Sequence, residues 1–242
     1  MRVGIISDLH ANLAALDAVL ASLGDERVDR VVCLGDVAAS GPEPGEVVAR
    51  LRGLDCPVVM GNADAFVLDP RPTGAEGDAG KVEEIDRWCA NQLCPDDSAF
   101  LRSFRPTVEI PLEGGARLLC YHGSPRGFDD LIAATTPEKE LAPMLAGHRA
   151  LVMAGGHWHF QMLRRFEDMV LINPGSVGLA YDLLPSGEAR VPSRAEYAVL
   201  TASGAAMDIA FRRVPYDGAA TVRAMFERGM PHAAWWSADW DR

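Results

Sequence analysis

Side chains that can bind metal ions follow the ends of several short apolar runs in this sequence. The first run, residues 3–6, shows no polar alternation, which favours a strand buried on both faces. Asp8 and His10 follow it. Because side chains two residues apart in an extended chain point to the same side, these two could bind one ion. Taken alone, this D-x-H spacing is more typical of a capping Asp and a surface His.

Four later apolar runs end in the same way. They lead into Gly35-Asp36, Gly61-Asn62, His122 and Gly156-His157-Trp158-His159. The backbones of His157 and His159 would lie about 6 to 7 Å apart if both side chains point to one side. That span lets each imidazole reach a different ion of a pair separated by about 3.5 to 4 Å.

Each of these strand ends could be ordinary turn chemistry, since Gly, Asn and Asp are common turn residues. Together they collect two carboxylates, one amide and four of the six histidines of the chain. Mixed nitrogen and oxygen donors of this kind suit a dinuclear site for manganese, iron or zinc. The repetition therefore predicts one metal centre at the carboxyl ends of neighbouring strands.

The elements that would position these side chains are alternating strands and helices in the first part of the sequence and mainly hairpins in the second. Strands are expected at 3–6, 28–34 and 57–60, with helices after Asn12 and Pro44 that end near Gly24 and Gly53. Residues 69–80 contain no apolar periodicity and predict a surface loop. Helices near 81–93 and 137–145, and hairpins over 108–121, 161–173 and 195–214, complete the expected fold.

Composition limits the classes of protein to which the chain can belong. We expect a single domain over residues 1–242, with a tryptophan-rich tail at about 230–242, because 48% of the residues are hydrophobic. No apolar run has transmembrane length and no signal segment precedes the first strand, so a cytoplasmic protein is expected. The net charge of −11 argues against general nucleic-acid binding. The five cysteines lack C-x-x-C spacing and are expected to be buried thiols.

Five linked motifs carry a resemblance to a known family. D-x-H, G-D, G-N, H and G-H-x-H occur in that order, and the chain thereby resembles the calcineurin-like metallophosphoesterase superfamily. It is most similar to small bacterial and archaeal predicted phosphodiesterases, through residues 61–64, 122–125 and 173–178. The resemblance implies an α/β fold, a four-layer α-β-β-α sandwich of two mixed β-sheets flanked by helices.

The resemblance also implies roles for the candidate residues. One ion would be held by Asp8, His10 and His159, the other by Asn62, His122 and His157, and Asp36 would bridge them. A water shared by both ions would lose its proton near neutral pH and attack phosphorus. We expect two divalent ions, with Mn²⁺ favoured and Fe, Zn or Ni as alternatives.

One position departs from the family pattern. Many members have G-N-H-[DE], in which the His is thought to protonate the leaving group, and this chain has Ala63 there. The resemblance leaves Asp64 without its usual partner, and losing a general acid typically costs 10² to 10⁴ in rate. We therefore expect catalysis that is slow or sensitive to the leaving group. The expected catalytic residues are Asp36, Asn62, Asp64 and Arg126, the last as a phosphate contact.

Three readings of the function stay open at this point. The first is a phosphodiesterase for small phosphodiesters or nucleotides, acting without membrane or general nucleic-acid partners. The second is a catalytically weak scaffold or protein-binding module, like the small subunit of the retromer coat, and the third is a protein phosphatase. Trp235, Trp236 and Trp240 could pack on the domain surface, cover the site or form a homo-oligomer contact.

Overall fold

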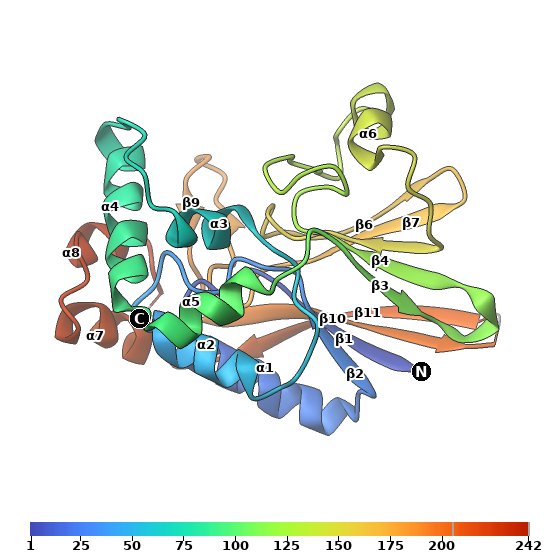
Figure 1. Ribbon diagram of the computed structural model, residues 1–242, viewed down its shortest axis with the longest axis horizontal. Helices are drawn as coiled ribbons and strands as arrows, with labels where there is room; N and C mark the ends of the chain where they lie inside the picture. The colour runs from blue at the N-terminus through green and yellow to red at the C-terminus, as the bar shows by residue number, and fades with distance from the viewer. Residues whose placement is uncertain (205, 242) are drawn as a thin grey trace.

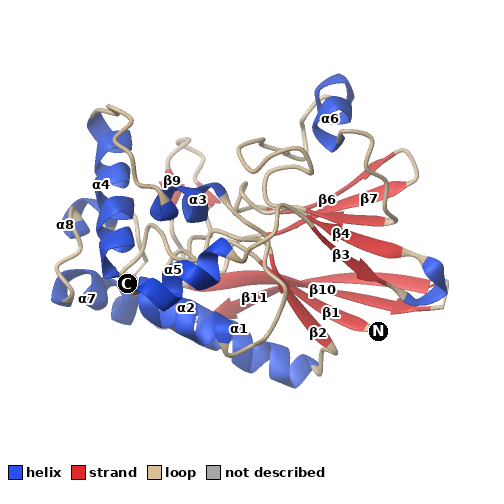
Figure 2. Cartoon of the chain, viewed as in Figure 1, coloured by secondary structure: helices blue, strands red, loops and turns tan. Residues whose placement is uncertain are grey.

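Two mixed β-sheets pack face to face in the computed structural model, which describes residues 1–204 and 206–241 (Figures 1 and 2). The strands are β1 (Arg2–Ile6), β2 (Arg30–Cys33), β3 (Val108–Pro111), β4 (Arg117–Cys120), β5 (Val152–Ala154), β6 (Gln161–Phe166), β7 (Met169–Pro174), β8 (Asp182–Leu183), β9 (Ala189–Arg190), β10 (Arg194–Ser203) and β11 (Ala206–Pro215). The α-helices are α1 (Leu13–Glu26), α2 (Pro44–Arg52), α3 (Asn62–Leu68), α4 (Gly77–Gln92), α5 (Pro95–Arg102), α6 (Glu138–Leu145), α7 (Gly218–Glu227) and α8 (Ala233–Trp236), and a short 3₁₀ helix spans Glu113–Gly115.

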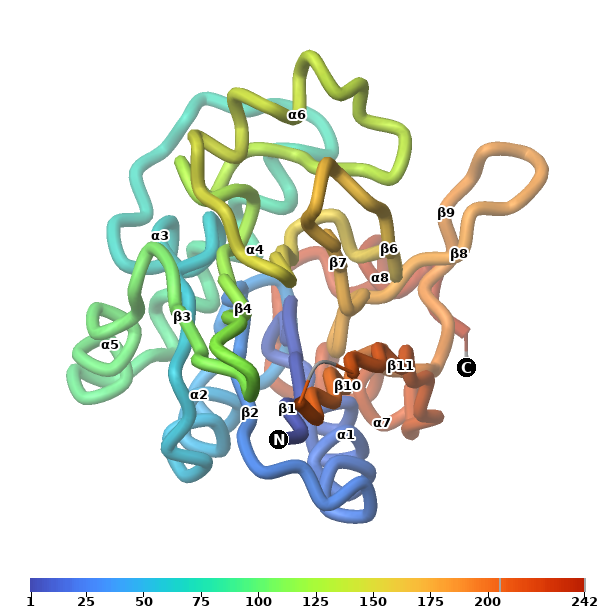
Figure 3. The backbone as a smooth tube through the Cα atoms, turned by 90° about the vertical axis from the view of Figure 1, so that its right-hand side faces the viewer, coloured from blue at the N-terminus to red at the C-terminus, as the bar shows by residue number. Residues whose placement is uncertain are grey.

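The two sheets place the ends of their parallel strands at a common edge. The first sheet has the order β11-β10-β1-β2, with β1 and β2 parallel, and the second has the order β3-β4-β5-β7-β6, with β4, β5 and β7 parallel. Helix α6 covers the outer face of the second sheet, while α1 and α2 cover the first (Figure 3). The expected four-layer sandwich is therefore confirmed.

Strand β1 is buried on both of its faces, as its continuous apolar run predicts. Val3 and Ile5 pack between the sheets, whereas Ile6 packs with Leu16 and Val19 of α1. The helix begins where expected, since the Asn12 side chain accepts a hydrogen bond from the Ala15 N–H. It continues past Gly24 and ends at Glu26, and its C-cap Arg27 adopts a left-handed conformation.

Three expectations about local structure are wrong. Residues 57–60 form no regular strand, because only Val58 and Val59 make isolated bridges, on opposite sides. Helix α3 begins directly after Gly61, where the sequence predicts no helix. The loop expected over 69–80 ends early, since α4 begins at Gly77 with a polar, exposed first turn that gives no apolar periodicity.

The last hairpin completes the first sheet, a pairing that its alternation did not reveal. Strand β10 lies antiparallel to β1 and places Val199 opposite Gly4. The tail then packs on the surface of the domain, where Trp240 is 7% exposed and bridges Val191. Among the helices that the structure describes, none is long and apolar enough to cross a membrane.

Helix α4 is joined to the loop after β2 by a buried hydrogen bond. The Ser40 hydroxyl donates to Asp86 Oδ1 over 2.7 Å. Burial raises the pKa of Asp86 to about 6, although the bond from Ser40 opposes the rise. Above that pH a carboxylate is buried with only this partner among the side chains described, which makes its charge costly.

Replacing Asp86 by Asn should stabilise the metal-free protein at pH 8 by roughly 1 to 3 kcal/mol. Asn keeps an oxygen that can accept from Ser40 but carries no charge. Because the folded-state pKa of about 6 lies above the ordinary 3.8, protonation of Asp86 supports the fold below about pH 4, and this support is lost as the pH rises through 6. Urea unfolding of Asp86→Asn and wild-type protein at pH 8 and at pH 4 measures the difference in the free energy of unfolding, which should disappear near pH 4.

Asp97 provides a control of opposite sign. Its burial is outweighed by hydrogen bonds from Cys94 and Arg52, which lower the pKa of Asp97. Asp97→Asn should therefore destabilise the protein more at pH 8 than at pH 4. Equal destabilisation by Asp86→Asn at both pH values would contradict the assignment of a buried charge to Asp86.

Candidate metal centre

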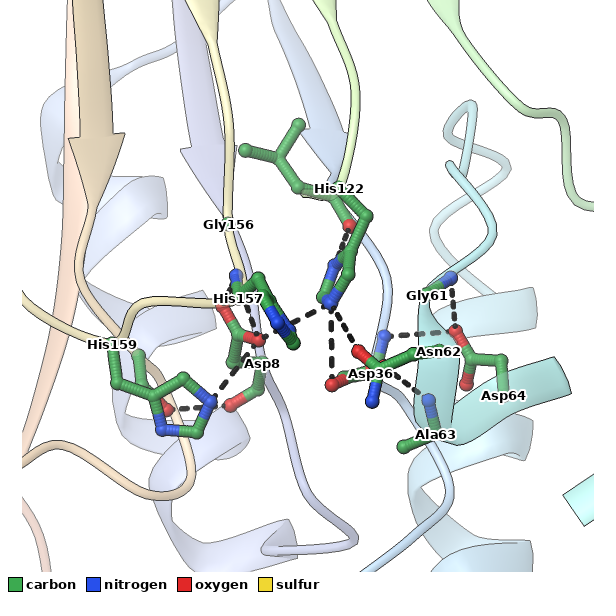
Figure 4. A network of polar contacts seen from close by, with 12 residues as sticks. Asp8, Asp36, Gly61, Asn62, Ala63, Asp64, His122, Gly156, His157 and His159 are labelled. Carbon is green, nitrogen blue, oxygen red and sulfur yellow. Dashed lines mark hydrogen bonds and ion pairs between the residues drawn. The ribbon is translucent and has the colours of Figure 1, made fainter. Parts of the chain in front are cut away.

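Seven side chains meet where β1, β2, β4 and β5 end, and Figure 4 labels all of them except His10. Asp8, His10, Asp36 and His159 form one group, and Asp36, His122 and His157 form a second, with the donor atoms of each group within 4.8 Å of one another. The Asn62 Oδ1 lies 3.0 Å from His122 Nε2 and adds an oxygen to the second group. Asp36 is common to both groups, and it is the residue for which the resemblance implies a bridging role.

The backbone at this edge is in an unusual conformation. Five of the seven residues, Asp8, His10, Asp36, His157 and His159, have φ between 44° and 65°. Left-handed conformations are uncommon outside Gly, Asn and Asp, and they cluster at functional sites where the surrounding structure enforces them. The turns after β1, β2 and β5 therefore carry local strain that aims the donor atoms inward.

Two glycines allow the chains to approach closely here. A Cβ on Gly61 would lie 2.1 Å from Asp36 Oδ1, and a Cβ on Gly156 would lie 2.1 Å from Ser7 Oγ. Both glycines directly precede a candidate metal-binding residue. The glycine in the G-N and G-H-x-H motifs is thus explained by contact with the neighbouring strand end.

Backbone carbonyls orient three of the four imidazoles. The Nδ1 atoms of His10, His122 and His159 lie 3.3, 2.7 and 2.7 Å from the carbonyl oxygens of Ala39, Leu34 and Leu179. A carbonyl can only accept, so each Nδ1 carries the proton and each Nε2 faces the cluster. This is the second-shell arrangement that directs a metal-binding His.

The Nε2 atoms then face other lone pairs. His10 Nε2 lies 3.1 Å from His159 Nε2, and His122 Nε2 lies 3.3 Å from Asp36 Oδ2. Two acceptors at such distances repel unless a proton or a cation lies between them. The donor set and its spacing therefore fit divalent cations.

Protons balance these charges when no cation is bound. Burial alone would lower the pKa of His122, but the Asp36 carboxylate outweighs it and raises the pKa to about 10. Burial and the neighbouring His159 lower the pKa of His10 to about 4, because two adjacent imidazoles cannot both be charged. The pKa of His159 rises through Asp8, despite its burial. Binding of divalent cations should therefore release protons.

Asp64 points away from the donor atoms and into the backbone. Its carboxylate accepts hydrogen bonds from the N–H groups of Asp36, Val37 and Gly61 over 2.8 to 3.1 Å. It therefore holds the turn that carries Asp36 against the start of α3, and acts as a positioning residue. Burial and the Asp36 charge raise the pKa of Asp64 to about 7.

Arg126 lies in the loop after β4 and pairs with Asp130. Its Nε and Nη2 donate to the two carboxylate oxygens over 2.6 and 2.7 Å. Within the described residues no hydrogen bond joins it to the cluster, so its contact with phosphate stays a prediction.

Several residues that support the site were not predicted from sequence. The Ser176 hydroxyl donates to the Asp8 carbonyl, and the Asn173 amide donates to that of Gly156. Residues 173–178 thus hold the backbone of two strand ends. Tyr181 stacks on His159 with ring centroids 5.5 Å apart and planes 10° apart. Because Tyr181 lies in a loop of mostly polar sequence, this contact was not predicted.

Replacing Asp64 by Asn should lower the free energy of unfolding by roughly 1 to 3 kcal/mol, because an amide NH₂ would face a buried backbone N–H. It should also weaken Mn²⁺ binding by roughly 10-fold or more through displacement of Asp36. Urea unfolding and calorimetric titration measure the two effects. The exposed Asp25→Asn is the control, and unchanged ion affinity in Asp64→Asn would contradict the positioning role.

Comparisons with known proteins agree with this geometry. The family model described as "Calcineurin-like phosphoesterase superfamily domain" matches residues 1–203. An uncharacterized protein of Methanocaldococcus jannaschii is 28% identical over 193 residues, which cover 74% of this chain and 77% of the relative.

Two solved structures are similar over nearly the whole chain. A metallophosphoesterase from Sphaerobacter thermophilus is 28% identical, with a TM-score of 0.75 over 99% of both chains. A hypothetical protein from Pyrococcus horikoshii has a TM-score of 0.79 and 17% identity, over 95% of this chain and 94% of the other, and supports the fold alone. Because the family model covers most of the sequence and the five motifs meet in one cluster, the chain belongs to the calcineurin-like phosphoesterase superfamily.

Proposed function

We propose that this metal-dependent phosphoesterase is a phosphodiesterase that hydrolyses small phosphodiesters or nucleotides. The observation that carries the proposal is the pair of donor groups that share Asp36. The family supports the phosphoester class. The preference for diesters rests on the similarity of residues 61–64, 122–125 and 173–178 to those of predicted phosphodiesterases.

The chain offers donor atoms for two divalent ions. Mn²⁺ is the proposed native metal. Asp8, His10 and His159 would hold one, Asn62, His122 and His157 the other, with Asp36 between them. When bound, such ions lower the pKa of a coordinated water to near neutrality and stabilise the charge that develops on phosphate.

The residues of the chain itself supply orientation. The Ala63 N–H donates to Asp36 Oδ1 over 2.9 Å, and the His157 N–H lies 3.2 Å from Asp8 Oδ2. These bonds hold both carboxylates in place before a substrate arrives, which reduces reorganisation during the reaction. Ala63 offers no proton to the leaving group, so acidic alcohols should leave fastest.

Metal-stripped protein reloaded with Mn²⁺ should hydrolyse bis(p-nitrophenyl) phosphate faster than p-nitrophenyl phosphate. The matched pair shares its chromophore and differs in the ester class, so kcat/KM for the two measures the preference directly. A chelator should remove the activity. Faster hydrolysis of the monoester would overturn the diesterase assignment, and no turnover with bound metal would favour a scaffold on this fold.

Asp36→Asn should reduce kcat by at least about 100-fold, because it removes the charge shared by the two donor groups. Asn tolerates the φ of 55° and keeps an oxygen for the Ala63 N–H, so the fold should persist. Asp55→Asn is the control, since Asp55 has a φ of 48° but is exposed. Full activity of Asp36→Asn at unchanged Mn²⁺ content would disprove the bridging role.

Arg126→Ala should raise KM for the diester if the guanidinium contacts phosphate, with a small effect on kcat. To do so, Arg126 must exchange at least one of its bonds to Asp130 for the substrate. Steady-state kinetics against the exposed Arg102→Ala variant measures the effect. An unchanged KM would remove Arg126 from the site.

A further inference from the structure

A cavity lies one aromatic ring away from the metal centre. It has a volume of about 180 Å³ and lies between the loop after β7 and the C-terminal tail. Its principal walls are Leu179, Tyr181, Val191, Trp235, Trp236 and Trp240. We call it the tryptophan cavity.

Residues of the loop after β7 connect the tryptophan cavity to the metal centre. Tyr181 stacks on the His159 ring at 5.5 Å, and the Leu179 carbonyl accepts from His159 Nδ1 over 2.7 Å. Both residues also line the cavity. A group bound there would therefore contact Tyr181, whose ring lies against that of His159.

The wall formed by the tail is held firmly in place. Helices α4 and α8 lie beside each other (Figure 1). The His232 ring bonds Glu84 over 2.7 Å, and the Lys81 ammonium lies 4.5 Å from the centre of the Trp235 ring. Backbone hydrogen bonds of 2.8 and 2.9 Å join Val191 to Asp239 and Asp241. The cavity is thus preorganised, which lowers the entropic cost of binding.

The lining of the cavity matches a flat, uncharged heteroaromatic ring. Indole and phenol rings stack on nucleobases with little regard to their sequence. Asp78 and Asp239 also line the cavity, where carboxylates can accept from an exocyclic amino group and repel a second phosphate. The volume is below that of usual whole-ligand pockets, so it suits one part of a substrate.

We propose that the tryptophan cavity binds the base of a nucleoside phosphodiester whose phosphate lies at the Asp8 and Asp36 cluster. This inference rests on the proposed function and names its substrate class. In hydrolysis, water loses a proton and forms the new P–O bond, while the P–O bond to the second alcohol breaks. The oxygen of that alcohol leaves with the electron pair and takes up a proton from solvent. The nucleoside stays on phosphate, held by its base.

The test compares diesters that release the same alcohol. Wild-type protein loaded with Mn²⁺ should show kcat/KM about 10-fold or more higher for the p-nitrophenyl ester of adenosine monophosphate than for methyl p-nitrophenyl phosphate. The kcat/KM for the uridine counterpart, whose base lacks an amino group, should lie between the values for these two esters. Hexyl p-nitrophenyl phosphate controls for apolar bulk, and an equal gain with it would overturn the inference.

Two variants localise the effect. Trp236→Leu removes a stacking ring, and Ala189→Trp fills the cavity from β9. Both variants should have about 10-fold lower kcat/KM for the adenosine ester than the wild-type protein, and unchanged kcat/KM for the methyl ester. Phe226→Leu, on the 53% exposed ring of α7, is the aromatic control, and thermal melts check that all three fold.

The outcomes separate this inference from the proposed function. Equal kcat/KM for the adenosine and methyl esters would overturn base binding but leave a phosphodiesterase. If neither ester is hydrolysed, the proposed function fails, and calorimetry with adenosine monophosphate decides about the cavity. Heat of binding that is lost in Ala189→Trp would support base binding, and no heat in the wild-type protein would overturn it.

Discussion

Two carboxylates buried among four imidazoles form the interaction on which the rest of this structure depends. Asp8 is fully buried and Asp36 is 3% exposed, and removing such charges from water is costly unless they are paired. Asp36 pairs with His122 and accepts a hydrogen bond from the Ala63 N–H, and Asp8 pairs with His159. The cluster is therefore stable only where several strand ends bring these donors together. Divalent cations would replace protons among the same atoms.

The fold meets this requirement by bringing two sheets to one edge. Strands β1 and β2 supply the carboxylates, and β4 and β5 supply histidines from the opposing sheet. Residues of this edge adopt left-handed conformations, and Asp64 binds three backbone N–H groups to keep one of these turns in place. The apolar contact between the sheets provides the stability that offsets this local strain.

The metal centre and the C-terminal tail are parts of one arrangement. Tyr181 links the two, because its ring stacks on His159, whose Nε2 faces the cluster, and it lines the tryptophan cavity together with the tail tryptophans. The chemistry at phosphorus and the recognition of the organic group would then be set by neighbouring side chains.

The sequence by itself determined the elements whose signals are local. The apolar run before Asp8, the Asn12 cap and the alternation of the last hairpin each predict their element, because burial and capping follow the periodicity of the chain. The order of the five motifs predicts which residues could meet around metal ions. Asp64 marks the limit, since the family resemblance implied a catalytic role whereas its carboxylate binds backbone N–H groups.

Only the tertiary structure decided how distant segments meet. Strand β10 pairs with β1 across almost the whole length of the chain, and Tyr181 stacks on His159 from a loop with no apolar pattern. The tail tryptophans line a cavity with that same loop. Such contacts join residues that share no local period, so they depend on the packing of the whole molecule, and no window of the sequence carries them.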